Sequence, residues 1–291
     1  MTNIERLSLP NTDEVARLNC HFPRREVPIG SGSVVSVREY GRGPALVCLH
    51  GIGSGAASWL PLADRMGCEA RLIAWDAPGY GISTPLAVAA PTIHDYVERL
   101  YSLIDVLNLQ RCTLIGHSFG ALIATAAVSN STLSKRVASV EQVILISPAG
   151  GYGAMPFQAG AVRAKRLEEL DSLGISGLAA LRSGRLLSDG ASALARQWVR
   201  WNMSQLNESG YRQAIELLCS EDLCRLLPST VPLQVWVGAL DEVTPPKACE
   251  FIARAAHTKL HQIANAGHAC FIEQPEAVAG LLRAVLENQN L

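Results

Sequence analysis

Charge is scarce in this chain of 291 residues: charged side chains make up 18% of it, and the formal net charge is −1. No basic stripe is present that would suit a nucleic acid. Long apolar runs are also missing, so no stretch approaches the length of a membrane-spanning helix. The polar N-terminal segment lacks the apolar centre of a secretory signal. We therefore expect a cytoplasmic protein, monomeric or homodimeric, whose partner is a small molecule and neither nucleic acid nor a membrane.

The eight cysteines form no C-x-x-C pair. Several of them lie in apolar runs, where cysteine behaves as a small hydrophobic residue. A disulfide framework would be unusual in a chain of this size without an export signal. We expect reduced thiols, and we expect neither a metal nor a cofactor.

The chain does contain 48% hydrophobic residues, enough for a sizeable core. They form short apolar runs that alternate with helical patterns, which is typical of an α/β fold with a parallel sheet covered by helices. A helix is expected from Thr92, as its N-cap, to about residue 109, and another over 275–287. The expected strands are 33–40, 45–50, 71–75, 112–115, 142–147, 233–237 and 259–263.

The pattern changes in the middle of the chain. From about residue 152 to 228 the sequence shows no strand-like apolar run, and arginines, two tryptophans and glycine breaks replace it. This stretch is longer than an ordinary loop and its pattern is helical. We expect an α/β core formed by residues 1–150 and 229–291, interrupted by a helical cap at 151–228.

The most specific motif is G-H-S-F-G at residues 116–120. An apolar run precedes it and a helical run of small residues follows it, which is the strand, sharp turn and helix that a nucleophile elbow requires. Its glycines let the strand and the helix approach closely. The turn holds Ser118 in a strained backbone conformation with its hydroxyl exposed. We therefore identify Ser118 as the candidate nucleophile.

A serine hydroxyl needs a base that takes its proton, and the base needs a third group that orients it. In the chain order nucleophile, acid, histidine, Asp241 and His268 fit. Each lies in a loop just past a strand, where open α/β sheets place their sites. Three weaker candidates remain, beside the acid, in a helical run and within a strand: Glu242, His257 and His261.

An oxyanion needs two donors that are aimed before the reaction. The N–H of Phe119, directly after the nucleophile, is the first. The glycine-rich loop after strand 45–50 supplies the second, and we expect it to be the N–H of Ile52. Gly51 and His117 adjoin these groups and are expected to contact the substrate.

The same loop carries a rival pattern, Gly51-x-Gly53-x-x-Ala56, with Asp76 at the end of the next strand. It is close to a dinucleotide-binding fingerprint, in which a helix N-terminus holds pyrophosphate. The match lies in the middle of the core and not in a first βαβ unit. The elbow, the acid and the histidine would then all be coincidences, so we disfavour this reading.

Taken in order, these motifs resemble the capped α/β-hydrolase superfamily over residues 34–286. The resemblance implies an α/β-hydrolase fold: an eight-stranded, mostly parallel sheet with an antiparallel second strand, helices on both faces and a helical cap after the sixth strand. The matching strings are His50-Gly51 with Trp59, Asp76 to Ser83, Gly116 to Gly120, Gly238-x-x-Asp241 and Gly267-His268.

Within the superfamily the chain is most similar to small-ester hydrolases and to the meta-cleavage-product hydrolases, which break carbon–carbon bonds. The latter usually carry asparagine before the serine and tryptophan after the histidine. This chain has His117 and Ala269 at those positions.

The cap is expected to shape the substrate site. Trp198 and Trp201 flank Arg200, which suggests an aromatic wall with an arginine that holds a carboxylate. The alternative is that these three residues pack the helices of the cap itself. Four other arginines are equally open candidates: Arg163, Arg182, Arg185 and Arg196.

We predict a cofactor-independent serine hydrolase that cleaves a small or medium carboxylic ester through an acyl-enzyme. One alternative is a carbon–carbon bond hydrolase of a vinylogous diketo acid. An alternative of another class is a ligand-binding, receptor-type protein with little turnover. A perhydrolase would share the triad and differ in its dependence on peroxide.

Overall fold

The computed structural model describes residues 12–129 and 140–289, which contain one eight-stranded sheet of strand order β1-β2-β4-β3-β5-β6-β7-β8. β2 runs antiparallel to β1 and β4, and the other neighbours are parallel. This confirms the mostly parallel sheet. The strands are β1 (Arg24–Pro28), β2 (Val34–Tyr40), β3 (Ala45–Leu49), β4 (Arg71–Trp75), β5 (Cys112–His117), β6 (Val140–Ile146), β7 (Leu233–Gly238) and β8 (Leu260–Ile263).

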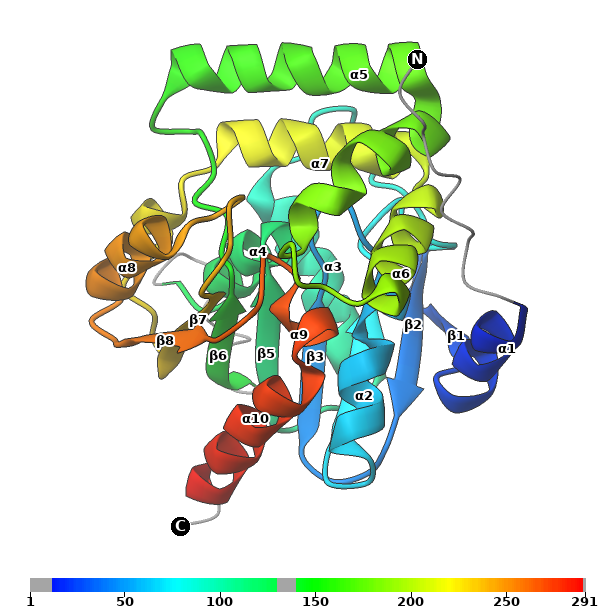
Figure 1. Cartoon of the computed structure of the whole chain (residues 1–291), viewed down its shortest axis with the longest axis vertical. Helices are drawn as coiled ribbons and strands as arrows, with labels where there is room; N and C mark the ends of the chain where they lie inside the picture. Colours follow the sequence, from blue (N-terminus) through cyan, green and yellow to red (C-terminus); the bar gives the residue numbers. More distant parts are fainter. Residues whose placement is uncertain (1–11, 130–139, 290–291) are drawn as a thin grey trace.

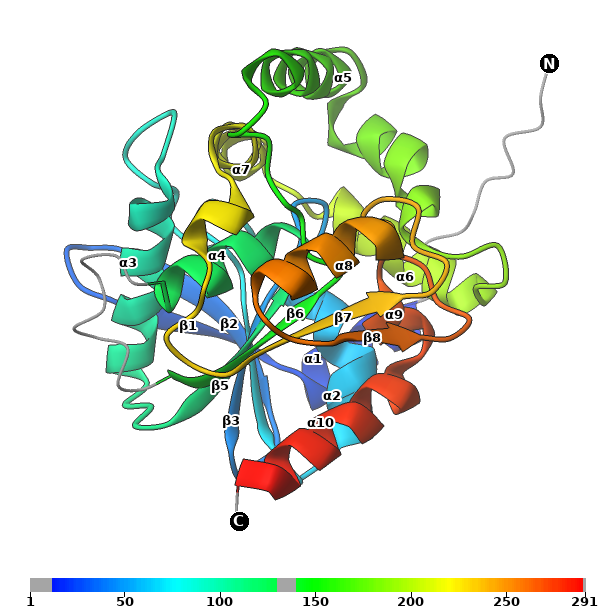
Figure 2. The same cartoon turned by 90° about the vertical axis from the view of Figure 1, so that its left-hand side faces the viewer.

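Helices cover both faces of the sheet (Figure 2). On one face lie α3 (Ile93–Val106), α4 (Phe119–Ala127) and α8 (Pro246–Ala255). On the other lie α1 (Thr12–His21), α2 (Leu60–Met66), α9 (Cys270–Glu273) and α10 (Pro275–Gln289). Within the described residues no helix is long and apolar enough to cross a membrane.

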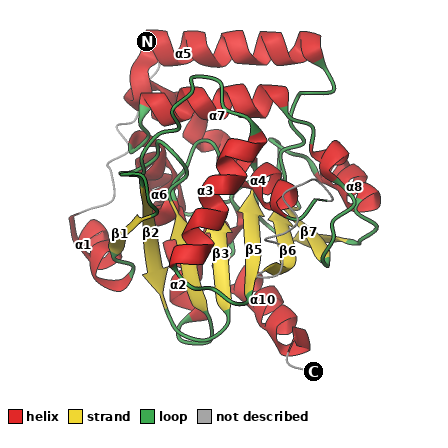
Figure 3. Ribbon diagram, turned by 180° about the vertical axis from the view of Figure 1, so that it is seen from behind, coloured by secondary structure: helices red, strands yellow, loops and turns green. Residues whose placement is uncertain are grey.

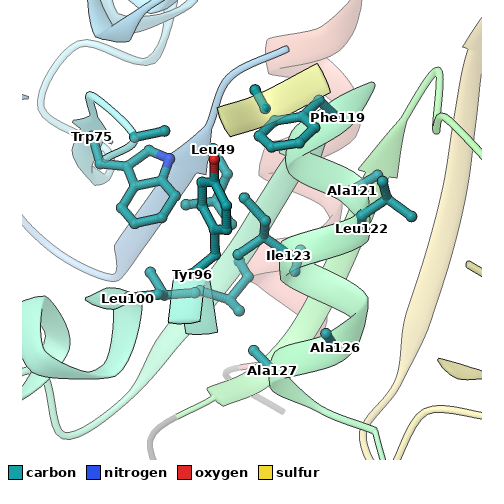
Figure 4. Packing of buried hydrophobic residues seen from close by; sticks show 14 of the residues in the cluster. Leu49, Trp75, Tyr96, Leu100, Phe119, Ala121, Leu122, Ile123, Ala126 and Ala127 are labelled. Carbon is teal, nitrogen blue, oxygen red and sulfur yellow. The ribbon is translucent and has the colours of Figure 1, made fainter. Parts of the chain in front are cut away.

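The central strands bury side chains on both faces because each face is covered. In β3, Val47 and Leu49 join the core under α3 and α4, whereas Leu46 and Cys48 join the core under α2 and α10. Figure 4 shows the first of these cores, in which Leu49 and other sheet residues meet Tyr96 of α3 and Phe119 of α4. This explains why the strands read as continuous apolar runs in the sequence.

The chain between β6 and β7 is helical wherever it has regular structure. It contains α5 (Pro156–Arg182), α6 (Ala193–Ser204) and α7 (Glu208–Ser220), with short 3-10 turns η3 (Ser183–Leu186) and η4 (Leu223–Leu226). α5 bends at Gly174, whose φ of 60° interrupts the helix. α5 and α7 lie one above the other over the carboxyl ends of the strands (Figures 1 and 3). This placement sets them above the loops that carry the motifs.

The cysteines are all free thiols, and most of them pack as apolar core residues. Cys20 and Cys68 are exposed, and Cys224 is half-buried. Burial raises the pKa of Cys112 and Cys249 to about 12, so these thiols stay protonated at neutral pH. Their role is packing and not nucleophilic chemistry.

Candidate active site

The turn between β5 and α4 holds Ser118 at φ 51° and ψ −112°, in the region that side chains rarely adopt. The neighbouring glycines are a steric requirement of this turn. A Cβ on Gly116 would lie 2.6 Å from the carbonyl oxygen of Gly120, and a Cβ on Gly120 would lie 2.3 Å from that of Leu49. Strand and helix therefore cross at backbone contact distance, and the serine between them is forced outwards, toward the cavity above the sheet.

Asp241 and His268 form a buried hydrogen-bonded pair next to this turn. The Nδ1 atom of His268 lies 2.9 Å from Oδ2 of Asp241, and the two residues are 2% and 3% exposed. They come from the loops after β8 and β7, which meet closely: a Cβ on Gly238 would lie 2.0 Å from the carbonyl oxygen of Gly267. The pair can hold the imidazole in one orientation, with Nε2 as its remaining ring nitrogen.

The carboxylate of Asp241 is kept ionised by its donors. Burial alone raises the pKa of this group, but hydrogen bonds from His268 and from Thr244 outweigh it, so the pKa of Asp241 lies below its ordinary value. The backbone N–H groups of Val243 and Thr244 donate to Oδ1 at 2.8 and 2.9 Å, and the Thr244 hydroxyl donates to Oδ2 at 2.9 Å. Thr244 is a supporting residue that the sequence motifs did not single out.

The rival candidates for acid and base lie elsewhere. Glu242, His257 and His261 are exposed, and none of them lines the cavity that Ser118 and His268 share. Burial separates Asp241 and His268 from these three neighbours in the chain.

A cavity of about 800 Å³ lies between these loops and the helical segment above them. Ser118, His268, Phe119 and Ile52 line it, as do Gly51 and His117. A Cβ on Gly51 would lie 3.2 Å from Cβ of Ser118, so the glycine-rich loop approaches the serine directly. Among the described residues, the N–H groups of Phe119 and Ile52 have no hydrogen-bond acceptor, and both remain available to a ligand.

A polar network holds the glycine-rich loop in place. His50 accepts a hydrogen bond from the Ala77 N–H at Nε2 (3.0 Å), so its Nδ1–H donates to the Gly51 carbonyl oxygen at 2.9 Å. The Tyr80 hydroxyl donates to the Ile52 carbonyl oxygen at 2.9 Å. Burial lowers the pKa of His50 and keeps its ring neutral. The loop is therefore set before any ligand arrives.

The carboxylate of Asp76 accepts from the Ala56 N–H at 2.8 Å and from the Ser36 hydroxyl at 2.7 Å. In a dinucleotide site the Ala56 N–H would face a phosphate, and the Asp76 carboxylate would face a ribose. Here each satisfies the other, so the resemblance of this loop to that fingerprint reflects a structural turn.

His117 is a second buried histidine, with its ring 4.8 Å from that of His268. Its Nε2 lies 3.1 Å from the carbonyl oxygen of His268 and donates to it. Burial, and then the proximity of His268, lower the pKa of His117 well below its ordinary value. The neutral ring thus anchors the backbone of the loop that carries His268.

The helical segment contacts that same loop through Glu273 in α9. Its carboxylate accepts from the N–H and the hydroxyl of Ser188 and, at 2.7 Å, from the N–H of Gly267. The Ala269 N–H donates to the Leu186 carbonyl oxygen at 2.8 Å. Residues on both sides of His268 are therefore tied to the segment above the sheet. No sequence motif marked Glu273, because its partners are distant in the chain.

Trp198, Arg200 and Trp201 do not line the cavity, in contrast to the expectation from the sequence. Trp198 is 4% exposed and packs into the core beneath α2 and α10, where its ring stacks at 5.0 Å on that of Trp201. α6 turns this face toward the core and away from the ligand space. Arg182 and Arg185, which were open candidates, do line the cavity, together with Lys165 and Arg166 of α5.

Comparison with known proteins identifies relatives over most of the chain. The chain is 30% identical over 268 residues to (E)-2-((N-methylformamido)methylene)succinate hydrolase of Acinetobacter baylyi, a match that covers 86% of this chain and 92% of that one. It is 23% identical to 3-oxoadipate enol-lactonase 1 of the same organism, over 84% and 90% of the two chains.

The fold is shared with a solved esterase from Thermogutta terrifontis, at a TM-score of 0.77 and 23% identity, over 91% of this chain and 98% of that chain. The model of the Alpha/beta hydrolase family matches residues 46–281. Because this match spans most of the sheet and the loops that carry the motifs, the chain belongs to the alpha/beta hydrolase family and is a hydrolase.

Proposed function

We propose that this hydrolase cleaves a small carboxylic ester without a cofactor, through an acyl-enzyme on Ser118. The observation that carries the proposal is the buried Asp241–His268 pair, whose histidine lines the same cavity as a serine held at φ 51°. A buried carboxylate that orients a histidine beside a strained serine is the arrangement that activates a hydroxyl.

The reaction has two halves. His268 takes the proton of the Ser118 hydroxyl at Nε2 as Oγ attacks the ester carbonyl, and the resulting oxyanion is held by the N–H groups of Phe119 and Ile52. When the intermediate collapses, the alkoxide leaves with the proton from His268. Water then repeats the sequence with His268 as base, which releases the acid and restores Ser118. Asp241 stabilises the imidazolium in both halves and stays ionised.

The helical segment 151–228 acts in this proposal as a cap that closes the cavity over the serine. Its contact with the core is close: a Cβ on Gly210 of α7 would lie 2.3 Å from the carbonyl oxygen of Gly79. We place the activity in the cytoplasm, and the free thiols of the cysteines support this placement.

The ester reaction is preferred to carbon–carbon cleavage. The relatives named above include a lactonase and an esterase, and both of those activities hydrolyse an ester bond. His117 and Ala269 also depart from the residues typical of the carbon–carbon hydrolases. A vinylogous diketo acid therefore belongs among the substrates tested, with turnover expected to be lower than for esters.

The first test is the intact mass after incubation with a fluorophosphonate, on the wild-type protein and on Ser118→Ala. We expect one adduct on the wild type and none on the variant, because only an activated serine reacts at an appreciable rate. An ester screen on both proteins follows, and Ser118→Ala is expected to lose activity by roughly 10⁴- to 10⁶-fold. An unlabelled wild type without turnover would contradict the proposal and favour a ligand-binding protein.

A further inference from the structure

Three arginines of α5 and α7 are paired with carboxylates of these helices. Arg163 of α5 reaches Glu216 of α7 at 2.7 Å. Arg182, at the end of α5, pairs with Glu169, and Arg212 of α7 pairs with Asp171. These ion pairs cross between helices or between turns and leave their arginines with a local counter-charge.

Arg166 is the exception among the arginines of α5 and α7. It lines the cavity and is half-buried, and among the described residues no carboxylate lies within ion-pair distance of it. Its NH1 donates to the hydroxyl of Tyr211 at 3.0 Å. One neutral partner satisfies one of the five N–H donors of a guanidinium and none of its charge. A half-buried cation without a counter-ion is costly unless a ligand supplies the charge.

The surroundings of Arg166 explain why a ligand could reach it. The lining of the cavity is largely apolar, with Leu178 of α5 and Leu218 of α7 as examples, and it includes Tyr211, the partner of Arg166. Asp222 also lines the cavity, but its carboxylate accepts from the Cys224 N–H at 3.0 Å and lies 3.5 Å from Arg225. The one acidic side chain of the described lining is thus engaged elsewhere.

Arg166 also stands near the oxyanion loop. Burial raises the pKa of Tyr80 well above its ordinary value, and Arg166 is close enough to oppose that rise. The Tyr80 hydroxyl in turn holds the Ile52 carbonyl oxygen. Arg166, Ile52 and Phe119 line the same cavity, so a ligand whose carbonyl sits at the Ile52 and Phe119 N–H groups shares that space with the cation.

We propose that Arg166 binds a carboxylate of the substrate remote from the bond that is cleaved, so that the enzyme acts on half-esters or lactones of dicarboxylic acids. The proposal rests on the ester hydrolysis described above and names its substrate class. A planar guanidinium matches a carboxylate with two parallel hydrogen bonds. Lys165 and Arg185 also line the cavity, but they are exposed, and solvent screens their charge more strongly.

The test compares two esters that differ in one charge: 4-nitrophenyl hydrogen adipate and its methyl ester, with the pimelate and suberate pairs as longer versions. For wild type we expect kcat/KM for at least one acid to exceed that of its methyl ester by tenfold or more. Arg166→Gln is expected to lower kcat/KM for the acid by roughly 10- to 100-fold, mainly through KM, because one charge-assisted contact is lost. The methyl ester should change by less than about threefold.

Two controls separate a local effect from misfolding. Arg163→Gln, three residues away on the same helix and paired with Glu216, should leave both substrates unchanged. Arg166→Lys keeps the charge without the planar fork and should fall between wild type and Arg166→Gln. An equal loss for the acid and the methyl ester in Arg166→Gln, or no preference for any acid in wild type, would overturn the proposal.

Binding without turnover distinguishes this proposal from the one on which it rests. Monomethyl adipate should raise the unfolding midpoint of Ser118→Ala and not that of Ser118→Ala with Arg166→Gln. If the fluorophosphonate labels Ser118 and this shift is absent, the carboxylate site is wrong and the hydrolase mechanism stands. If the shift is present while labelling fails, the carboxylate site stands and the mechanism is wrong.

Discussion

The floor and the roof of the cavity are built differently. The floor consists of the loops after β3, β5, β7 and β8, and the roof is the helical segment 151–228. In the floor, polar groups such as Asp241, His50 and Asp76 are buried and satisfied by hydrogen bonds with nearby backbone. In the roof, charges are half-buried or exposed and pair across helices, and Arg166 has no acidic partner among the described residues.

The glycines show the same contrast. Gly116, Gly120 and Gly238 of the floor each face backbone atoms closer than 3 Å from where a Cβ would lie. In the roof, Gly210 faces the Gly79 backbone just as closely where α7 meets the core, whereas Gly160 and Gly184 face open space. The floor is constrained by backbone contacts that any side chain would break. The roof meets the core through backbone contacts as well, but α5 and α7 are joined by side-chain ion pairs that can change one at a time. We infer that the floor sets the reaction and the roof selects the substrate.

The largest expected effect is the loss of kcat when the buried carboxylate of the floor is neutralised. Asp241→Asn removes the carboxylate that orients His268 and stabilises its charged form, so kcat should fall by about 10⁴-fold. Glu242→Gln changes the neighbouring, exposed carboxylate and should leave kcat within about twofold. Steady-state kinetics on the best ester of the screen checks both. Equal losses in the two variants would mean that the acid has been misassigned.

The floor was largely predictable from the sequence, and the roof was not. The elbow, Asp241 and His268 are fixed by local facts: glycine spacing, an apolar run before each loop, and chain order. The prediction that Trp198 and Arg200 line the cavity failed, because a helical pattern shows which residues share a face of a helix but not which face meets the cavity. Arg166 was missed for a related reason. Arg163 on the same helix is paired with Glu216, which is distant in the sequence, and only the folded chain shows that Arg166 has no such partner among the described residues.

A smaller effect is expected on stability, and it tests the contrast in glycines directly. Gly120→Ala places a Cβ 2.3 Å from a backbone oxygen of β3, which should lower the free energy of unfolding by about 3 kcal/mol or prevent folding. Gly160→Ala, on the open side of α5, should raise it by about 0.5–1 kcal/mol through helix propensity. Urea unfolding measures both, and a destabilised Gly160→Ala would show that this side of α5 is as tightly packed as the floor.

The smallest effect concerns the neutral histidines of the floor. Because the pKa of His117 is lowered in the folded state, the unfolded chain alone takes up a proton below about pH 6.5. Stability should therefore fall as pH decreases below that value, by about 1.4 kcal/mol per pH unit for each such histidine, and His50 adds a second contribution of the same sign.

His117→Gln keeps a donor for the His268 carbonyl oxygen and removes the titrating ring. Its free energy of unfolding, measured by urea titration from pH 7 to pH 5, should decline less steeply than that of wild type. The difference in slope should correspond to about one proton fewer taken up on unfolding. His257→Gln, at an exposed position, is the matched control. If the slope of His117→Gln equals that of wild type, His117 accepts a proton in the folded protein. The floor would then tolerate a positive charge on His117, and the contrast between the neutral histidines of the floor and the charged roof would be weaker than the geometry implies.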